Sequence, residues 1–301
     1  MEDVRSSRPV AGVLWMLLTG VLFVGVTALV KILGVRVPAP EAAFLRYAMG
    51  LVFLIPMFGR LRNAHLTPRQ LKLFIIRGIA HAGGVALWFF AMARMPIADV
   101  TALNYLSPIY VTIGAGIFLG ETLAFRRIMA VVVALIGALI IIRPGFQEIG
   151  TGHIAMLIAA VFFATSYLIA KRMADETGAE VTVTMLSIVV TICLAPMAAY
   201  NWVTPTGNEL LLLLGVALVA TMGHYIMSIA LSLAPIMVTQ PVSFLQLVWA
   251  ILLGYFAFNE GIDPWVVFGG GLIIGAIFFI TLREARLKRR IRTPSVPETK
   301  L

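Results

Sequence analysis

The sequence has little cysteine and little charge. Its single cysteine, Cys193, excludes an intrachain disulfide and a metal centre made of several cysteines. Charged residues make up 12% of the chain and hydrophobic residues 60%, and the mean hydropathy is +0.99. Soluble domains have about a quarter of their residues charged, so this composition indicates a protein with many membrane spans.

Acidic residues are missing from the centres of the apolar stretches. Asp99 lies near the start of one stretch, and Glu121 and Glu260 follow the ends of two others. A proton relay built on buried carboxylates is therefore not expected. The sequence also lacks the glycine-rich loop that would bind ATP in a primary pump. We expect no cofactor and no metal site.

The sequence contains ten apolar runs joined by short connections. A backbone in hydrocarbon must satisfy its hydrogen bonds within its own segment, so runs of this length are predicted to be helices. The first run is long enough to span and lacks a small-residue cleavage site, which favours a retained helix over a signal peptide. The predicted fold class is an all-α membrane protein with ten transmembrane helices, at 11–33, 41–58, 70–92, 97–119, 127–143, 153–173, 179–198, 209–230, 236–257 and 264–282.

The net charge of +9 comes from basic residues in the connections and the tail rather than on one helix face. This distribution is typical of topology signals and of contacts with anionic lipid, so nucleic acid is not an expected partner. Most Lys and Arg residues fall on one side of the membrane when the N-terminus is placed inside. The predicted location is the cell inner membrane, with both termini cytoplasmic.

The two halves of the chain resemble each other. Residues 12–33 match 152–173 at an offset of 140, and a second block agrees at an offset of 139. Five helices per repeat is an odd number, so the second repeat is expected to be inverted, with a binding site between the repeats near the midplane. The predicted parts are an N-terminal segment 1–10, repeat 1 at 11–144, repeat 2 at 152–283 and a basic tail 284–301. The matched pairs include Gly12/Gly152, Phe23/Phe163, Lys31/Lys171, Gly84/Gly223, Pro96/Pro235 and Glu121/Glu260.

Polar and aromatic side chains recur every three residues in the fourth and ninth runs, and residues at this spacing lie close to one helix face. Hydrogen bonding between helices is the structural alternative for any one of them. The recurrence in both halves instead favours a substrate cavity. The residues are Asn104, Ser107 and Tyr110 in the fourth run and, at an offset of 139, Ser243, Gln246 and Trp249 in the ninth.

Other runs add candidates at similar depth. His81 and Trp88 are seven residues apart in the third run, Tyr167 lies in the sixth, and Tyr225 follows His224 in the eighth. A membrane histidine can carry protons, but a neutral imidazole bonded to a nearby hydroxyl or backbone group is the favoured interpretation. The predicted site is neutral, aromatic and amphipathic. Such a site suits a zwitterion with an apolar side chain better than a phosphate or a polyanion.

Several other residues leave two interpretations open. Arg46 is expected to extend to the membrane surface or to meet Glu41. Prolines inside the runs are either hinges or static bends. Close glycines are expected to serve a rigid scaffold or a dimer contact, so both a monomer and a homodimer fit. These residues are Pro56, Pro108, Pro196 and Pro241, and Gly116, Gly120, Gly269, Gly270, Gly271 and Gly275.

Residues 10–284 resemble the EamA group of the drug/metabolite transporter superfamily. The resemblance is carried by Pro-Ile at the start of the fourth and ninth runs, and by Gly120-Glu121 and Asn259-Glu260 at their ends. It implies an inner-membrane carrier, often an exporter of amino acids, with a central cavity lined by the first, third, fourth, sixth, eighth and ninth helices. The region from His81 to Trp88 is similar to exporters of aromatic amino acids. Other members carry riboflavin, S-adenosylmethionine or nucleotide sugars.

We therefore expect a secondary carrier that exports aromatic or other neutral amino acids by alternating access, with riboflavin or S-adenosylmethionine as alternative substrates. A membrane enzyme is disfavoured because no carboxylate pair or histidine cluster is apparent, with His65 and His153 isolated at opposite faces. A channel is disfavoured because no charged or carbonyl-lined constriction is apparent. The predicted substrate-binding residues are His81, Trp88, Asn104, Ser107, Tyr110, Tyr167, Tyr225, Gln246 and Trp249.

Overall fold

The computed structural model describes residues 9–118, 125–144, 149–177, 179–233 and 242–292, and this part of the chain is helical apart from its connections. The all-α prediction is confirmed, and each of the ten apolar runs contains one or two helices. The helices are α1 (Pro9–Leu33), α2 (Ala39–Phe53), α3 (Ile55–Arg62), α4 (Pro68–Met92), α5 (Ile97–Asn104), α6 (Leu106–Phe118), α7 (Phe125–Ile142), α8 (Thr151–Thr177), α9 (Ala179–Tyr200), α10 (Gly207–Leu233), α12 (Gln246–Phe258) and α13 (Pro264–Arg292).

Six of these helices are long and apolar enough to span a membrane, namely α1, α4, α8, α9, α10 and α13. Together α2 and α3 make a seventh candidate, bent by 77°. Two shorter apolar helices lie in the fifth and ninth runs. The number of crossings and the ten-helix repeat therefore stay predictions.

Local sequence explains several helix boundaries. α4 begins with a capping box, in which the Thr67 hydroxyl accepts the Gln70 N–H and Gln70 Oε1 accepts the Thr67 N–H at 2.9 Å. The bend between α2 and α3 lies just before Pro56, which has no N–H to donate to the preceding turn. Pro196, in contrast, lies inside the continuous helix α9. Pro241 lies outside the described residues.

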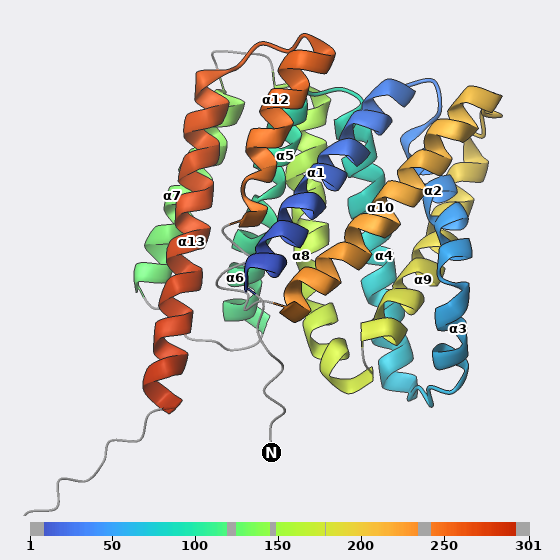
Figure 1. The fold of residues 1–301 in the computed structure, drawn as a ribbon, viewed down its shortest axis with the longest axis horizontal. Coiled ribbons are helices and arrows are strands. Elements are labelled where there is room, and N and C mark those ends of the chain that lie inside the picture. The colour runs from blue at the N-terminus through green and yellow to red at the C-terminus, as the bar shows by residue number, and fades with distance from the viewer. Residues whose placement is uncertain (1–8, 119–124, 145–148, 178, 234–241, 293–301) are drawn as a thin grey trace, which may run out of the picture.

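Each of the main helix pairs joins one helix from the first half of the chain to one from the second half (Figure 1). The main pairs are α1 with α10 and α4 with α8, followed by α7 with α13, α2 with α9 and α4 with α9. A shift of about 140 residues exchanges the first two pairs and maps the α7–α13 pair and the α2–α9 pair each onto itself. This is the packing that a two-fold relation between the halves requires, although the inverted repeat itself stays a prediction.

Helices α1 and α8, the first of each predicted repeat, run in opposite directions. Lys31, near the end of α1, donates to the Met95 carbonyl at 2.8 Å. Gly152, at the start of α8, lies against the same methionine, since an added Cβ would be 2.6 Å from Met95 Cγ. We call this end of the bundle the Lys31 end. The start of α1 and the end of α13 both lie at the opposite end (Figure 1).

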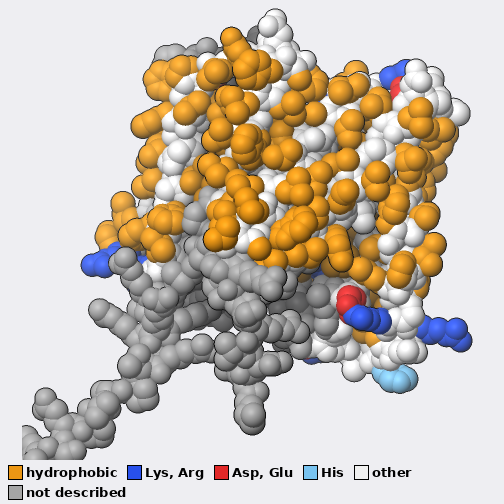
Figure 2. Space-filling model, viewed as in Figure 1, with side chains coloured by type: hydrophobic (Ala, Val, Ile, Leu, Met, Phe, Trp, Pro, Cys, Tyr) orange, Lys and Arg blue, Asp and Glu red, His pale blue; other side chains and the backbone are white. Residues whose placement is uncertain are grey.

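The outside of the bundle is apolar. Figure 2 shows hydrophobic side chains over most of the visible described face, with the charged side chains near its two ends. Soluble monomers rarely expose a continuous apolar patch of more than a few hundred Å², so this surface fits a bilayer. One exposed stripe follows α10 at helical spacing and consists of Leu211, Leu214, Leu218, Met222 and Tyr225.

The closest helix approach joins α7 and α13. A Cβ on Gly137 would lie 2.6 Å from the Gly269 carbonyl oxygen, and a Cβ on Gly269 would lie 2.5 Å from that of Gly137. Gly271 and Gly275 have no such neighbour, because an added Cβ at either would meet no atom within 4 Å. Within the described chain the tight contact therefore uses Gly269 rather than the predicted Gly271/Gly275 spacing. Gly120 and the surroundings of Gly116 lie outside the description.

Replacing Gly269 with valine is expected to destabilise the protein by about 1–3 kcal/mol, because the new side chain would overlap the backbone of α7, which cannot move aside cheaply. The measurement is the melting temperature of the purified protein in detergent. Gly275→Val is the matched control, since it adds the same side chain on the same helix where no atom is in the way. Equal melting temperatures for the two variants would contradict the close approach.

Candidate functional site

We call the polar and aromatic residues that recur every three positions in the fourth and ninth runs the ladder. Both of these runs are interrupted, and they meet at the interruptions. α5 ends at Asn104 and α6 begins at Leu106, because Pro108 cannot donate to the Asn104 carbonyl. The Tyr105 hydroxyl at this break donates to the Ser243 carbonyl at 3.2 Å, and its ring meets the Phe244 ring edge-on at 5.4 Å. Tyr105 and Phe244 are also separated by the repeat offset of 139. Sequence reasoning missed Tyr105, although Pro108 three residues later was a signal.

Three ladder side chains carry buried polar atoms without a partner. Asn104 Oδ1, Ser107 Oγ and Trp249 Nε1 make no hydrogen bond to any residue that the structure describes. Buried polar atoms are normally satisfied, and leaving them unpaired is costly. These three atoms therefore do not form hydrogen bonds between helices, which was the alternative interpretation of these residues. They remain available to a ligand.

Helix α1 packs beside the α12 part of the ladder. A Cβ on Gly20 would lie 3.6 Å from Trp249 Cδ1 and 3.7 Å from Gln246 Cβ, so this glycine lets α12 approach α1. The Trp249 ring also packs with Val24. Tyr110 is half-buried against the main core. The structure thus places Gln246 and Trp249, the ladder residues of α12, next to α1.

A second group of side chains surrounds His81 on α4. Its Nε2 lies 3.0 Å from the Tyr47 hydroxyl and its Nδ1 lies 3.2 Å from the Ser166 hydroxyl. Its ring is 5.3 Å from the Phe163 ring, which also meets Trp88 at 6.2 Å. Both ring nitrogens thus have hydroxyl partners, which agrees with a neutral imidazole. We call Tyr47, His81, Trp88, Phe163 and Ser166 the His81 cluster.

The two remaining predicted tyrosines are both exposed. Tyr167, four residues after Phe163 on α8, is 59% exposed and lies within electrostatic reach of Arg77 and Tyr47. Tyr225 is 61% exposed and belongs to the apolar stripe of α10. The structure therefore does not bring Tyr225 together with the other candidates. Its neighbour His224 packs instead against the Phe23 ring of α1 at 5.0 Å.

Two arginines are buried within the bundle. Arg77, the tenth residue of α4, is buried, and its Nη1 donates to the Thr182 carbonyl at 2.9 Å. Arg46 is also buried, and its guanidinium lies over the Tyr47 ring, 4.0 Å from the ring centroid. It forms no ion pair with Glu41, whose Oε2 accepts the Val203 N–H at 2.9 Å. Arg46 therefore neither extends to the membrane surface nor pairs with Glu41, the two alternatives that the sequence left open.

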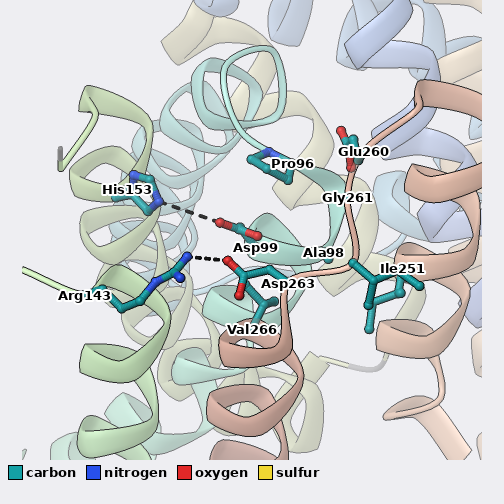
Figure 3. Close-up of a pocket in the computed structure, with 11 residues that line it drawn as sticks. Pro96, Ala98, Asp99, Arg143, His153, Ile251, Glu260, Gly261, Asp263 and Val266 are labelled. Atoms are coloured by element: carbon teal, nitrogen blue, oxygen red, sulfur yellow. Dashed lines mark hydrogen bonds and ion pairs between the residues drawn. The ribbon is translucent and has the colours of Figure 1, made fainter. Parts of the chain in front are cut away.

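A cavity of about 240 Å³ lies at the Lys31 end between α5, α7, α8, α12 and α13. Figure 3 shows its charged lining, with His153 Nε2 3.7 Å from Asp99 Oδ2 and Arg143 paired with Asp263. His153 is thus not isolated, contrary to the sequence analysis. The pairing could not be read from the sequence because these residues come from four separate segments.

Glu260 joins three helices at the same end. Its carboxylate forms an ion pair with Lys31 at the end of α1 and accepts the Ile97 N–H at the start of α5, at 3.0 Å. The Glu260 N–H donates to the Gly254 carbonyl of α12 at 3.0 Å. We call Glu260, Lys31 and the Ile97 N–H the Glu260 latch. Glu121 and the Lys171 side chain, at the equivalent sequence positions, lie outside the description.

Comparisons with known proteins agree with this architecture. The EamA-like transporter family matches residues 10–143 and 150–282. A riboflavin transporter of Rhizobium johnstonii is 30% identical over 290 residues, covering 95% of this chain and 96% of the relative. An S-adenosylmethionine uptake transporter of Rickettsia felis is 27% identical, covering 93% and 95%. The pseudopaline exporter CntI of Pseudomonas aeruginosa is 27% identical, covering 88% and 94%.

The fold is also found among solved structures. One structure, described only as the crystal structure of a protein, aligns with a TM-score of 0.58 over 94% of this chain and 98% of its own. The two sequences are 18% identical, so this likeness concerns the fold alone.

Proposed function

Because the chain belongs to the EamA-like transporter family, and is thus a small-metabolite carrier of the bacterial inner membrane rather than an enzyme, we propose that it moves a ring-bearing metabolite that is neutral or zwitterionic. The substrate would alternate between the two membrane faces at a site shared by both halves of the chain. The termini would lie in the cytoplasm, as the distribution of Lys and Arg predicts.

The observation that carries this proposal is the set of unpaired buried atoms on the ladder helices. Asn104 and Ser107 come from one half of the chain and Trp249 from the other. An oxygen acceptor, a hydroxyl oxygen and an indole N–H can together bind a ligand with both donors and acceptors. The Tyr110 and Trp249 rings add flat apolar surface for a ring. A small amphipathic molecule with a planar ring meets these requirements.

Three kinds of substrate should be tested first, and a different observation favours each. The aromatic ladder and the region from His81 to Trp88 favour an aromatic amino acid, which combines a ring with polar groups. The riboflavin transporter, 30% identical over nearly the full length of both chains, favours riboflavin, which combines a larger planar ring with hydroxyl groups. S-adenosylmethionine, from the Rickettsia relative, also joins a ring to polar groups.

Counterflow in liposomes tests the proposal. The purified protein would be reconstituted, and uptake of labelled tryptophan, phenylalanine, riboflavin and S-adenosylmethionine measured into vesicles preloaded with the same unlabelled compound, with and without a pH gradient. We expect saturable counterflow of at least one ring-bearing compound without the gradient. Flux that rises linearly with concentration would indicate a pore, and no flux of any compound would refute the substrate class.

Ser107→Ala is expected to raise the half-saturation concentration of the transported compound about fivefold, because one neutral hydrogen bond contributes about 1 kcal/mol. Folding should not suffer, since the buried Ser107 hydroxyl has no partner among the described residues. The control is Thr112→Val on the same helix, whose hydroxyl is already bonded to the Pro108 carbonyl at 3.0 Å. Unchanged saturation in Ser107→Ala would remove this residue from the site.

A further inference from the structure

Arg46 is a buried cation that lacks a counter-ion. It lies seven residues into α2, about 10 Å along the helix from its first residue, and is 9% exposed. A guanidinium remains charged at any physiological pH, and burying it without a partner is energetically expensive. Its guanidinium lies over the Tyr47 ring, with the guanidinium carbon 4.0 Å from the ring centroid. Among the described residues, no oxygen accepts a hydrogen bond from it.

The carboxylates that the structure describes are all engaged elsewhere. Glu41, on the same helix as Arg46, is bonded to the Val203 N–H at 2.9 Å. The other carboxylates whose side chains the structure describes have basic partners of their own, so none of these serves Arg46. These pairs are Glu260 with Lys31, Glu209 with Arg36, Glu180 with Arg60, Glu176 with Arg69, Asp263 with Arg143, and Asp99 with His153.

The surroundings of Arg46 combine positive potential with aromatic surface. His81 on α4 and His224 on α10 both lie within electrostatic reach of its charge. The Tyr47 hydroxyl connects it to the His81 cluster, where the Phe163 and Trp88 rings lie 6.2 Å apart. Unlike Arg77 Nε, which is fully enclosed, the Arg46 guanidinium retains some exposed surface.

From this arrangement we infer that Arg46 binds the carboxylate group of the transported metabolite, whose ring lies toward Trp88 and Phe163. The inference rests on the proposed function and narrows its substrate class to compounds with a carboxylate. The planar guanidinium can donate two parallel hydrogen bonds to a carboxylate, and the bound anion supplies the counter-charge that the described residues do not. Aromatic amino acids meet this requirement and riboflavin does not.

The test compares tryptophan with tryptophanamide, which keeps the ring and the amine but lacks the carboxylate. Binding is measured by the melting temperature of the purified protein in chloride-free buffer, and transport by counterflow inhibition. We expect wild type to need at least tenfold less tryptophan than tryptophanamide for the same effect. Arg46→Gln should abolish that preference. Its melting temperature without ligand should equal or exceed that of wild type, because an unpaired buried charge has been removed.

Arg94→Gln is the matched control. Arg94 also lies over an aromatic ring, that of Phe90, with its guanidinium carbon 3.7 Å from the centroid, but it is exposed and donates to the Phe90 carbonyl at 3.1 Å. This variant should retain the wild-type preference. Arg46→Lys keeps the charge but not the planar fork, so it should bind tryptophan more weakly than wild type while folding normally.

The outcomes separate this inference from the proposed function. Equal responses of wild type to tryptophan and its amide, or a full preference in Arg46→Gln, would overturn the carboxylate site. If riboflavin exchanges equally well in wild type and Arg46→Gln while no carboxylate binds, the carrier function stands and the inference fails. If tryptophan stabilises wild type but not Arg46→Gln and no ring-bearing compound exchanges, the anion site stands and the proposed transport fails.

Discussion

Alanine at Trp249 is expected to lower transport about 100-fold. The substitution removes both the ring surface and the unpaired indole N–H, and together these contribute about 3 kcal/mol to binding a ring-bearing ligand. Gln246→Ala should have a smaller effect in the same direction, since Gln246 lies one turn earlier beside the same glycine of α1. The measurement is counterflow by reconstituted protein, normalised to the amount inserted.

Because Trp249 also packs on α1, a folding defect must be separated from a binding defect. Trp249→Phe keeps most of the packing and loses the N–H, so it should fold normally and transport at an intermediate rate. Trp265→Ala is the control, since Trp265 is 53% exposed at the start of α13 and far from the ladder in sequence. Wild-type transport by both Trp249→Ala and Gln246→Ala would exclude the α12 ladder from the site.

Glu260→Gln is expected to open the Lys31 end. The structure shows α1, α5 and α12 held together there by the Glu260 latch, and alternating access requires such contacts to separate. Neutralising the partly buried carboxylate leaves Lys31 without its ion-pair partner, at a cost of about 1–3 kcal/mol to the closed state. The ratio of open to closed state should therefore rise about 5- to 150-fold.

The readout is the labelling rate of a cysteine placed at Ala98 in a variant whose native Cys193 has been replaced. Ala98 lines the cavity at the Lys31 end, so a membrane-impermeant maleimide should modify it faster when that end opens. Asp263→Asn is the control, because the Asp263 pair with Arg143 links α7 and α13, which pack together along their length. Equal labelling rates in Glu260→Gln and the parent would show that the latch does not hold the closed state.

Much of the fold could be predicted because the bilayer leaves a chain few options. Apolar runs of spanning length must become helices, and the structure contains helices at each of the ten runs. The repeat offset also related Ser107 to Gln246 and Tyr110 to Trp249 before any contact was known. What the pattern did not reveal was the break at Tyr105, since a proline shows that a bend is possible but not where the chain departs from the helix.

The candidate site was harder to predict because its remaining parts depend on tertiary packing. Asp99 and His153 face each other only because α5 packs on α8, and no spacing in the sequence encodes that distance. Arg46 resembles any arginine near a helix end until its orientation over Tyr47 is known. Tyr225 looked like a cavity residue because of its neighbour His224, yet one step along a helix turns a side chain by about 100°.

The contact between Gly137 and Gly269 makes α7 and α13 a natural frame of reference for measuring motion. At this crossing the two backbones touch, and the side chains of Ile141, Leu272 and Ile273 pack closely around the contact, so we expect the pair to move as one body. Spin labels on the exposed faces of these two helices should therefore keep a constant separation while the protein transports. Distances from this frame to α1 or α10 would then report the transport movement itself.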